Sequence, residues 1–180
     1  MLFFPVLLVF VFLAFVAQHF LPSLPNDARI YLLPLLVFYS AVATPFWMML
    51  VVAFASGWMW DAFNAQVLDA GVEISIGSSI LLYAIFGAIM SGFRPVFQRG
   101  RWDVYVLASF LCGVFTAIIA VSEFAMICFR RNGFFFTKEL GWRVAGSGLA
   151  ATAIAPVLFV FLNIVARLCG YEPRAARRDD

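Results

Sequence analysis

The first twenty residues decide which solvent this chain needs. Residues 2–20 read LFFPVLLVFVFLAFVAQHF and contain no Asp, Glu, Lys or Arg. A helix needs roughly 20 apolar residues to cross about 30 Å of hydrocarbon, so this run predicts a transmembrane span. It lacks a positively charged start and an A-x-A cleavage site, which favours a retained span over a signal peptide.

The rest of the chain continues this pattern. Of its 180 residues, 64% are hydrophobic and 12% are charged, and the mean hydropathy is +0.98. A soluble domain has about twice that share of charge and could not hide so much apolar surface from water. We therefore predict an all-α fold, a polytopic membrane helix bundle with about six transmembrane helices. It would form one bundle over residues 1–170, with a charged, disordered tail over residues 171–180.

Turn signals divide the chain into six spans. Their predicted ranges are 2–20, 28–43, 46–63, 76–93, 104–129 and 144–168. Pro34 in the middle of the second span predicts a kink. Trp47 near one end of the third span, and Trp58 and Trp60 near the other, predict its two membrane interfaces. The polar residues 64–75 predict a loop.

Six spans place both termini on one side of the membrane. If that side is the cytoplasm, seven of the twelve basic residues lie inside: Arg94, Arg99, Arg101, Arg167, Arg174, Arg177 and Arg178. The other five lie outside: Arg29, Arg130, Arg131, Lys138 and Arg143. Cytoplasmic loops of membrane proteins carry an excess of Lys and Arg, so the difference favours cytoplasmic termini.

Several function classes find no support in the sequence. The net charge is +2 and no basic cluster is dense enough to bind nucleic acid. Cys112, Cys128 and Cys169 form no CxxC pair and there is one histidine, which argues against a zinc site or a disulfide framework. No H-E-x-x-H, G-x-S-x-G or phosphate-binding loop occurs. We predict no enzymatic activity, no metal site and no cofactor.

A polar cluster is predicted toward the outer half of the bundle. Asp61 and Glu123 lie inside apolar spans, where an ionised carboxylate costs a few kcal/mol. With His19, they lie near the outward ends of spans one, three and five, and Arg130 and Arg143 border that side. The cluster would either hold the helices in register or bind a ligand or partner. Catalysis is the least favoured alternative, because Ser122 adjoins Glu123 and points elsewhere on the helix.

Small residues recur four apart on several spans, which lets helices approach closely in lipid. Ala53 and Gly57 precede Asp61 on one face. The other pairs are Ala84 and Ala88, Gly87 and Ser91, Gly146 and Ala150, and Ala151 and Ala155. These faces predict packing within the bundle or association with another membrane protein.

At Gly57-Trp-Met-Trp-Asp61 the chain resembles the rod shape-determining protein MreD family. In that family a glycine, three apolar residues and an aspartate end the third span. Further features of the resemblance are Gly77 opening the next span, Arg94 and Arg99 closing it, Glu123 in the fifth span, Ala155-Pro156-Val-Leu-Phe159 in the last, and Arg167 at its end. The resemblance is best over residues 45–99 and 143–169.

The resemblance implies a non-enzymatic role in a bacterial cytoplasmic (inner) membrane. Members of the family belong to the rod, or cell wall elongation, complex and support lateral peptidoglycan synthesis and cell shape. The implied partners are an MreC-like bitopic protein, MreB filaments, and RodA with its class B penicillin-binding partner. The inner arginines would meet anionic membrane lipid.

Two other classes remain open. The substrate-binding subunit of an energy-coupling-factor vitamin transporter is also a six-span protein of this size, and its pocket would lie at the outer polar cluster. Such subunits usually carry Ala-xxx-Ala on the first span, whereas Ala14 and Ala17 have a different spacing. A membrane-embedded enzyme is the third possibility and has no motif in its favour.

Overall fold

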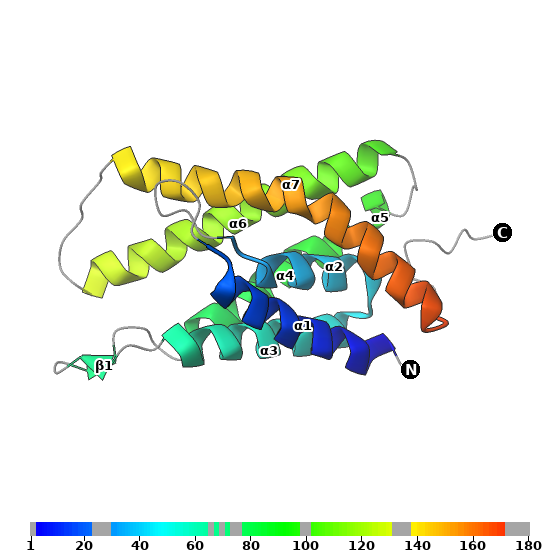
Figure 1. Cartoon of the computed structure of the whole chain (residues 1–180), viewed down its shortest axis with the longest axis horizontal. Coiled ribbons are helices and arrows are strands. Elements are labelled where there is room, and N and C mark those ends of the chain that lie inside the picture. The colour runs from blue at the N-terminus through cyan, green and yellow to red at the C-terminus, as the bar shows by residue number, and fades with distance from the viewer. Residues whose placement is uncertain are drawn as a thin grey trace.

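The structure, a computed structural model, describes residues 3–22, 30–64, 67–68, 71–72, 77–97, 102–130 and 138–171. The elements are α1 (Phe3–Phe20), α2 (Leu33–Ala43), α3 (Phe46–Asn64), β1 (Val67–Leu68), β2 (Gly71–Val72), α4 (Ser78–Gly92), α5 (Arg94–Phe97), α6 (Trp102–Arg130) and α7 (Lys138–Leu168) (Figure 1). Helices account for nearly all of this part of the chain. The two short strands pair antiparallel within the segment predicted as a loop.

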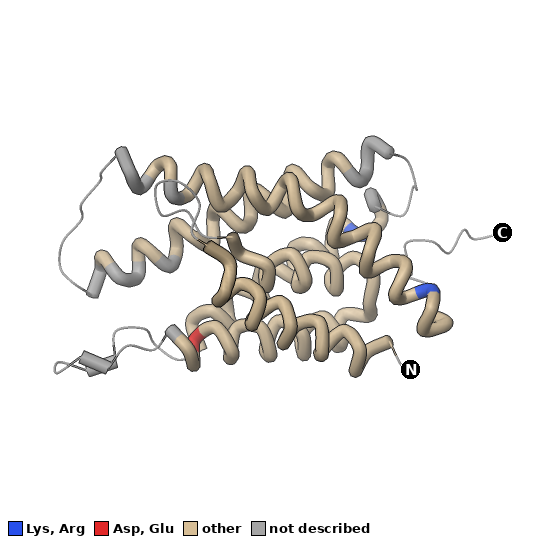
Figure 2. The backbone as a smooth tube through the Cα atoms, viewed as in Figure 1, with Lys and Arg blue, Asp and Glu red and all other residues tan. Residues whose placement is uncertain are grey.

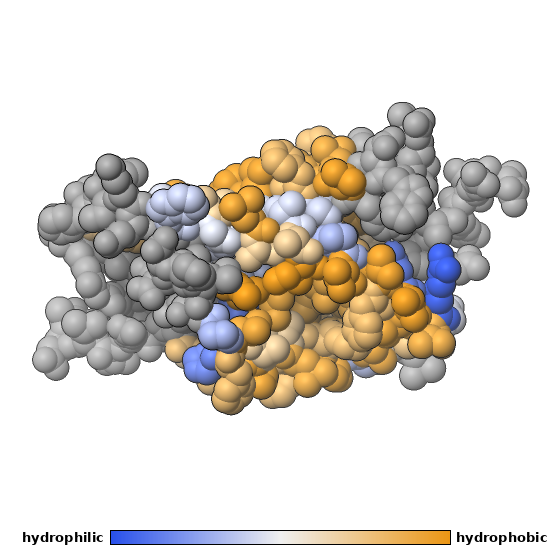
Figure 3. Space-filling model, turned by 45° about the horizontal axis from the view of Figure 1, so that its top comes forward, coloured by the Kyte–Doolittle hydropathy of each residue, from blue (hydrophilic) through white to orange (hydrophobic). Residues whose placement is uncertain are grey.

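The helices have the apolar character of a membrane bundle. Three are long and apolar enough to cross a membrane, namely Phe3–Phe20, Phe46–Phe63 and Val144–Leu168, and three apolar stretches are shorter, namely Leu33–Ala43, Ser78–Gly92 and Val106–Ser122. One of these six stretches lies in each predicted span. Exposed apolar side chains cover much of the described surface in Figure 3, with hydrophilic residues toward its ends. The predicted all-α membrane helix bundle is confirmed.

The second span differs from its prediction. Helix α2 begins at Leu33, and Pro34 lies in its first turn. Proline is well suited to that position, because its missing N–H would have no acceptor within the helix. The predicted kink in the middle of this span is therefore wrong: Pro34 starts the helix.

The last predicted span, 144–168, coincides with the apolar stretch Val144–Leu168, but the helix that contains it is longer. Helix α7 begins at Lys138 rather than at residue 144, and Pro156 lies inside it. A proline in a helix interior removes one backbone hydrogen bond and bends the helix. Figure 1 shows α7 changing direction in its orange middle stretch.

Helix α2 lies at the centre of the bundle. It has 11 residues, and all except Val42 are buried. At 1.5 Å per residue it is about 16 Å long, roughly half the hydrocarbon thickness. It contacts α1, α3, α4, α6 and α7. The centre of the fold is thus a short apolar helix enclosed by longer ones.

Aromatic rings connect α2 to its neighbours. Phe38 of α2 stacks on Phe159 of α7, with ring centroids 5.4 Å apart and an interplanar angle of 12°. On its other side Phe38 contacts Phe86 of α4, and Phe86 contacts Phe115 of α6 at 4.3 Å. Four helices therefore share one continuous aromatic cluster, which adds to the burial of apolar surface.

The helices alternate in direction in a way that matches the predicted topology. In Figure 1, α1, α3 and α6 run away from the end where α1 begins, whereas α2, α4 and α7 return to it. The start of α1 and the end of α7 accordingly lie at the same end of the bundle. The most extensive packing joins α3 with α4 and α6 with α7.

Glycines allow the closest helix contacts. A Cβ atom placed on Gly57 of α3 would lie 2.5 Å from the backbone N and Cα of Ile80 in α4. A Cβ on Gly113 of α6 would lie 2.7 Å from the carbonyl oxygen of Gly148 in α7 and would overlap Thr152. At both crossings the backbones approach too closely for any side chain, as in other small-residue contacts between membrane helices.

The other small residues differ in their surroundings. Ala53, Ala151 and Ala155 are buried, whereas Ala84, Gly146 and Ala150 are half-buried and Ala88 is exposed. On α4 the contact with α3 involves Gly87, where an added Cβ would overlap the sulfur of Met49. Successive residues on a helix point about 100° apart, so Gly87 and Ala88 face different surroundings.

Candidate functional site

Asp61 is the one described acidic side chain, and it is completely buried near the end of α3. Its Oδ2 atom accepts hydrogen bonds from the backbone N–H of Gly77 at 2.6 Å and of Ser79 at 3.3 Å. The first N–H belongs to the N-cap residue of α4, and the second belongs to its first turn. Gly57 lies one turn before Asp61 on the same face of α3 and contacts Ile80 of the same turn. The spacing glycine-xxx-aspartate therefore makes one contact surface for the start of α4.

The chemistry of a helix start explains why a carboxylate is stable there. The first N–H groups of a helix have no acceptor within it, and the helix dipole places partial positive charge at that end. Gly77, the residue before α4, has φ of 106°, a conformation that glycine adopts more readily than other residues. This conformation turns its N–H toward Asp61. The Oδ1 atom of Asp61 is buried and has no hydrogen-bond partner among the described residues.

Arg94 binds a helix end at the opposite end of the bundle from Asp61. It follows α4, and its guanidinium Nη2 donates to the carbonyl oxygen of Ala41 at 2.7 Å and to that of Thr44. These carbonyls belong to the last turn of α2 and to its C-cap. A helix C-terminus has unpaired carbonyl groups and partial negative charge, so a cation is favourable there.

Two more polar side chains complete the ends of α2. At its start, Gln18 Oε1 of α1 accepts from the N–H of Leu32 at 2.9 Å and of Leu33 at 3.4 Å. At its end, the Tyr171 hydroxyl donates to the Ala43 carbonyl at 3.1 Å, while its ring stacks on Phe3. Both ends of the buried helix are thus satisfied by side chains from other helices, which a water-free interior requires.

The predicted members of the polar cluster have different environments. His19 is exposed, with its ring against the edge of Phe20. Glu123 and Arg130 lie on α6 and Arg143 on α7, but their side chains lie outside the described part of the structure. The outward ends of α1, α3 and α6 point the same way in Figure 1, yet α3 and α6 are not major packing partners. The described partners of Asp61 are backbone N–H groups, and not an arginine as expected.

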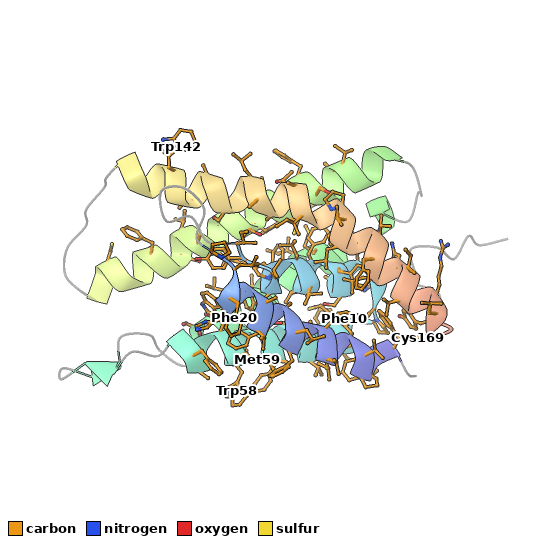
Figure 4. All side chains as sticks on the ribbon, viewed as in Figure 1. Phe10, Phe20, Trp58, Met59, Trp142 and Cys169 are labelled. Atoms are coloured by element: carbon orange, nitrogen blue, oxygen red, sulfur yellow. The ribbon has the colours of Figure 1, made fainter. Side chains whose placement is uncertain are left out.

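The three tryptophans of α3 also differ in their exposure. Trp47 and Trp58 are exposed toward opposite ends of the helix, as interface residues would be. Figure 4 shows Trp58 pointing away from the bundle. Trp60, in contrast, is buried against Tyr31, with ring centroids 5.5 Å apart. Trp60 therefore packs inside the bundle beside the start of α2, while its predicted depth at the membrane interface stays a prediction.

Sequence reasoning missed Gln18 and Tyr171 as helix caps, and Tyr39 and Asn163 as a polar pair. The Tyr39 hydroxyl of α2 donates to Asn163 Oδ1 of α7 at 3.0 Å. The available signal was the position of each polar residue within or just beyond an apolar run. Tyr171, which the sequence assigns to the tail, packs on the bundle, and residues 172–180 lie outside the described range.

Comparison with protein-family models, curated proteins and solved structures finds no match for the chain.

The arrangement is suited to holding helices together. Asp61, Arg94, Gln18 and Tyr171 each bind backbone groups of a helix other than their own. Within the described ranges, no three His, Cys, Asp or Glu side chains come close enough to hold a metal ion. These residues supply hydrogen-bond partners to the unpaired N–H and C=O groups at the start of α4 and at both ends of α2, inside a low-dielectric interior.

Proposed function

We propose that this chain is a non-enzymatic scaffold of a bacterial rod complex, the assembly that directs lateral cell wall synthesis. It would lie in the cytoplasmic membrane with both termini inside. Its partners would be an MreC-like bitopic protein, MreB filaments, and RodA with its class B penicillin-binding partner.

One observation carries the proposal: five of the residues on which the resemblance to the MreD family rests make contacts between helices. Gly57 and Asp61 meet the start of α4, Gly77 supplies the bonded N–H, and Arg94 binds the end of α2. Phe159 stacks on Phe38 at the centre. Residues that hold the helices in one arrangement suit a protein that acts by presenting a binding surface and not by catalysing a reaction.

The distribution of mass supports the same proposal. Helices form most of the described chain, and the connection between α2 and α3 is only Thr44 and Pro45. A chain with so little extramembrane mass would meet its partners mainly through lipid-facing helix surfaces. Association with a single-span protein such as an MreC-like partner fits that geometry.

Depletion in a rod-shaped host tests the proposal. Loss of the protein should make cells round and spread new wall material, seen with a fluorescent cell-wall precursor, over the whole surface. Re-expression of the wild-type chain should restore both. Cells that keep their shape and wall-insertion pattern but lose uptake of a vitamin would contradict the scaffold proposal and support the transporter alternative.

Co-purification provides the biochemical test. A tagged chain solubilised in mild detergent should recover the MreC-like protein, whereas an unrelated tagged six-span protein at equal expression should not. Equal recovery of the MreC-like protein with both tagged proteins would contradict its assignment as a partner.

A further inference from the structure

Asn163 presents an amide that is held in one orientation. It lies on α7, is half-buried, and its Oδ1 atom accepts the hydrogen bond from Tyr39. Tyr39 is buried in α2, so the oxygen side of the amide faces the bundle. The Nδ2 group has no hydrogen bond among the described residues. The amide therefore has two N–H donors that an acceptor outside the bundle would stabilise.

Arg167 lies one turn further along α7, on the same face as Asn163. Its side chain is exposed. The helix ends one residue later, at Leu168. Gly170 in the following turn has φ of 65°, and the ring of Tyr171 stacks on that of Phe3. The guanidinium of Arg167 thus lies beside the end of the bundle, with the amide of Asn163 deeper along the same helix face.

The charged side chains that the structure describes are those of Asp61, Arg94 and Arg167. Asp61 bonds the start of α4, whereas Arg94 follows the end of α4 and Arg167 lies in the last turn of α7. Figure 2 accordingly shows acidic colour toward one end of the bundle and basic colour toward the other. Arg94 is already bonded to α2. Of the two arginine side chains that the structure describes, Arg167 is the exposed one and is open to an external anion at that end.

Beside Asn163 and Arg167, α7 has an exposed apolar surface. Val160, Ile164 and Leu168 are each more than half exposed, with Leu168 at 82%. A guanidinium and an amide at the end of such a surface match an amphiphile that has an anionic head and a hydrocarbon chain. The guanidinium fork suits two oxygens of one phosphate.

We propose that Arg167 and Asn163 bind the phosphate of an anionic phospholipid, with one acyl chain lying along α7. The guanidinium would hold two phosphate oxygens and the Asn163 Nδ2 group would donate to a further oxygen near the glycerol. This inference is independent of the rod-complex proposal, because it needs only the chain and the lipid.

Native mass spectrometry of the full chain in detergent tests the site, with phosphatidylglycerol, phosphatidylcholine and diacylglycerol as probes. The wild type should retain phosphatidylglycerol in preference to the other two lipids. Arg167→Gln should reduce that retention roughly five-fold, which corresponds to about 1 kcal/mol for one basic residue. Arg174→Gln removes the same charge from the C-terminal tail and should leave retention unchanged.

Asn163→Asp tests the amide. The aspartate keeps an acceptor for Tyr39 but replaces the Nδ2 donors with an oxygen, so phosphatidylglycerol retention should fall at least as far as in Arg167→Gln. If this variant does not fold, Asn163→Ser replaces it, with the same expectation of reduced retention. Equal losses in Arg167→Gln and Arg174→Gln would show general charge attraction and overturn the site. Equal retention of diacylglycerol, or unchanged retention in the Asn163 variant, would also overturn it.

Discussion

Asp61 and Arg94 lie at opposite ends of the parallel helices α2 and α4, and each is hydrogen-bonded to the backbone of a helix end. Asp61 accepts from the first turn of α4, and Arg94, which follows α4, donates to the last carbonyls of α2. The acid thus meets a helix N-terminus and the base a helix C-terminus, the arrangement that the helix dipole favours. Asp61, whose place inside an apolar span needed a partner, and Arg94 thus stabilise the ends of α4 and α2.

The two helices are parallel and in register. The ring of Phe38 in α2 contacts that of Phe86 in α4. Closer to the C-terminal ends of both helices, the Ser91 hydroxyl donates to the Ala41 carbonyl oxygen at 3.4 Å. Parallel helices place like partial charges side by side, which is unfavourable without a counter-charge. Asp61 at one end and Arg94 at the other provide these counter-charges.

Asp61→Leu should lower the free energy of unfolding by roughly 2–3 kcal/mol, because two N–H groups of α4 lose a charged acceptor inside the bundle. Asp61→Asn keeps a neutral acceptor and should lose about 1 kcal/mol. Cys112 and Cys128 are buried, so a thiol-reactive dye can follow unfolding in detergent. Equal stabilities for Asp61→Leu and the wild type would mean that the hydrogen bonds to α4 contribute nothing.

Gly57→Ala should lower stability by about 1–3 kcal/mol, since its Cβ would overlap the backbone of Ile80, which cannot move without displacing α4. Gly92→Ala is the matched control on α4, because a Cβ there would meet no atom within 4 Å. The control should stay within about 0.5 kcal/mol of the wild type. A thermal unfolding series that ranks the two variants in reverse order would contradict the α3–α4 contact.

Arg94→Lys should lower stability by about 1–2 kcal/mol even though it keeps the charge. A lysine ammonium lacks the planar fork with which the guanidinium reaches the carbonyls of Ala41 and Thr44. Tyr171→Phe removes one hydrogen bond to α2 but keeps the ring on Phe3, and should lose about 1 kcal/mol. Arg94→Lys without any loss, measured by the same dye assay, would show that charge alone matters at this end.

The proposed orientation predicts where cysteines react. Cys169 lies at the end where α7 finishes, labelled in Figure 4, and is half-buried. An impermeant maleimide should label it only after intact spheroplasts are permeabilised. His19→Cys places a thiol at an exposed position at the other end of α1, and it should react in intact spheroplasts. The opposite labelling pattern would invert the topology.

The helices were predictable because a lipid-solvated helix needs a long apolar run, and such runs can be read directly from the sequence. Asp61 could also be recognised as a residue that needs a partner, and Gly57 as a contact on the same face. The partner itself could not be identified. It depends on the conformation of Gly77, sixteen residues away, and on how the chain returns between them.

The length of α2 was not predictable from composition. Residues 30–32 are apolar and continue the run, yet they are not helical. The helix starts where Gln18 accepts from Leu32 and Leu33 and where Pro34 fits a first turn. It ends where Arg94 and Tyr171 donate to its carbonyls. These hydrogen-bond partners are distant from α2 in the sequence, so the local sequence of α2 does not predict them.

Hydrogen–deuterium exchange of the chain in lipid nanodiscs tests most directly the claim that Asp61 fastens α4 to α3. In the wild type, the amides of Gly77 and Ser79 should exchange slowly. In Asp61→Leu the first turn of α4 should exchange much faster, while α6 and α7 keep their protection. Equal protection of that turn in both proteins would contradict the account, and so would a loss spread evenly over all helices.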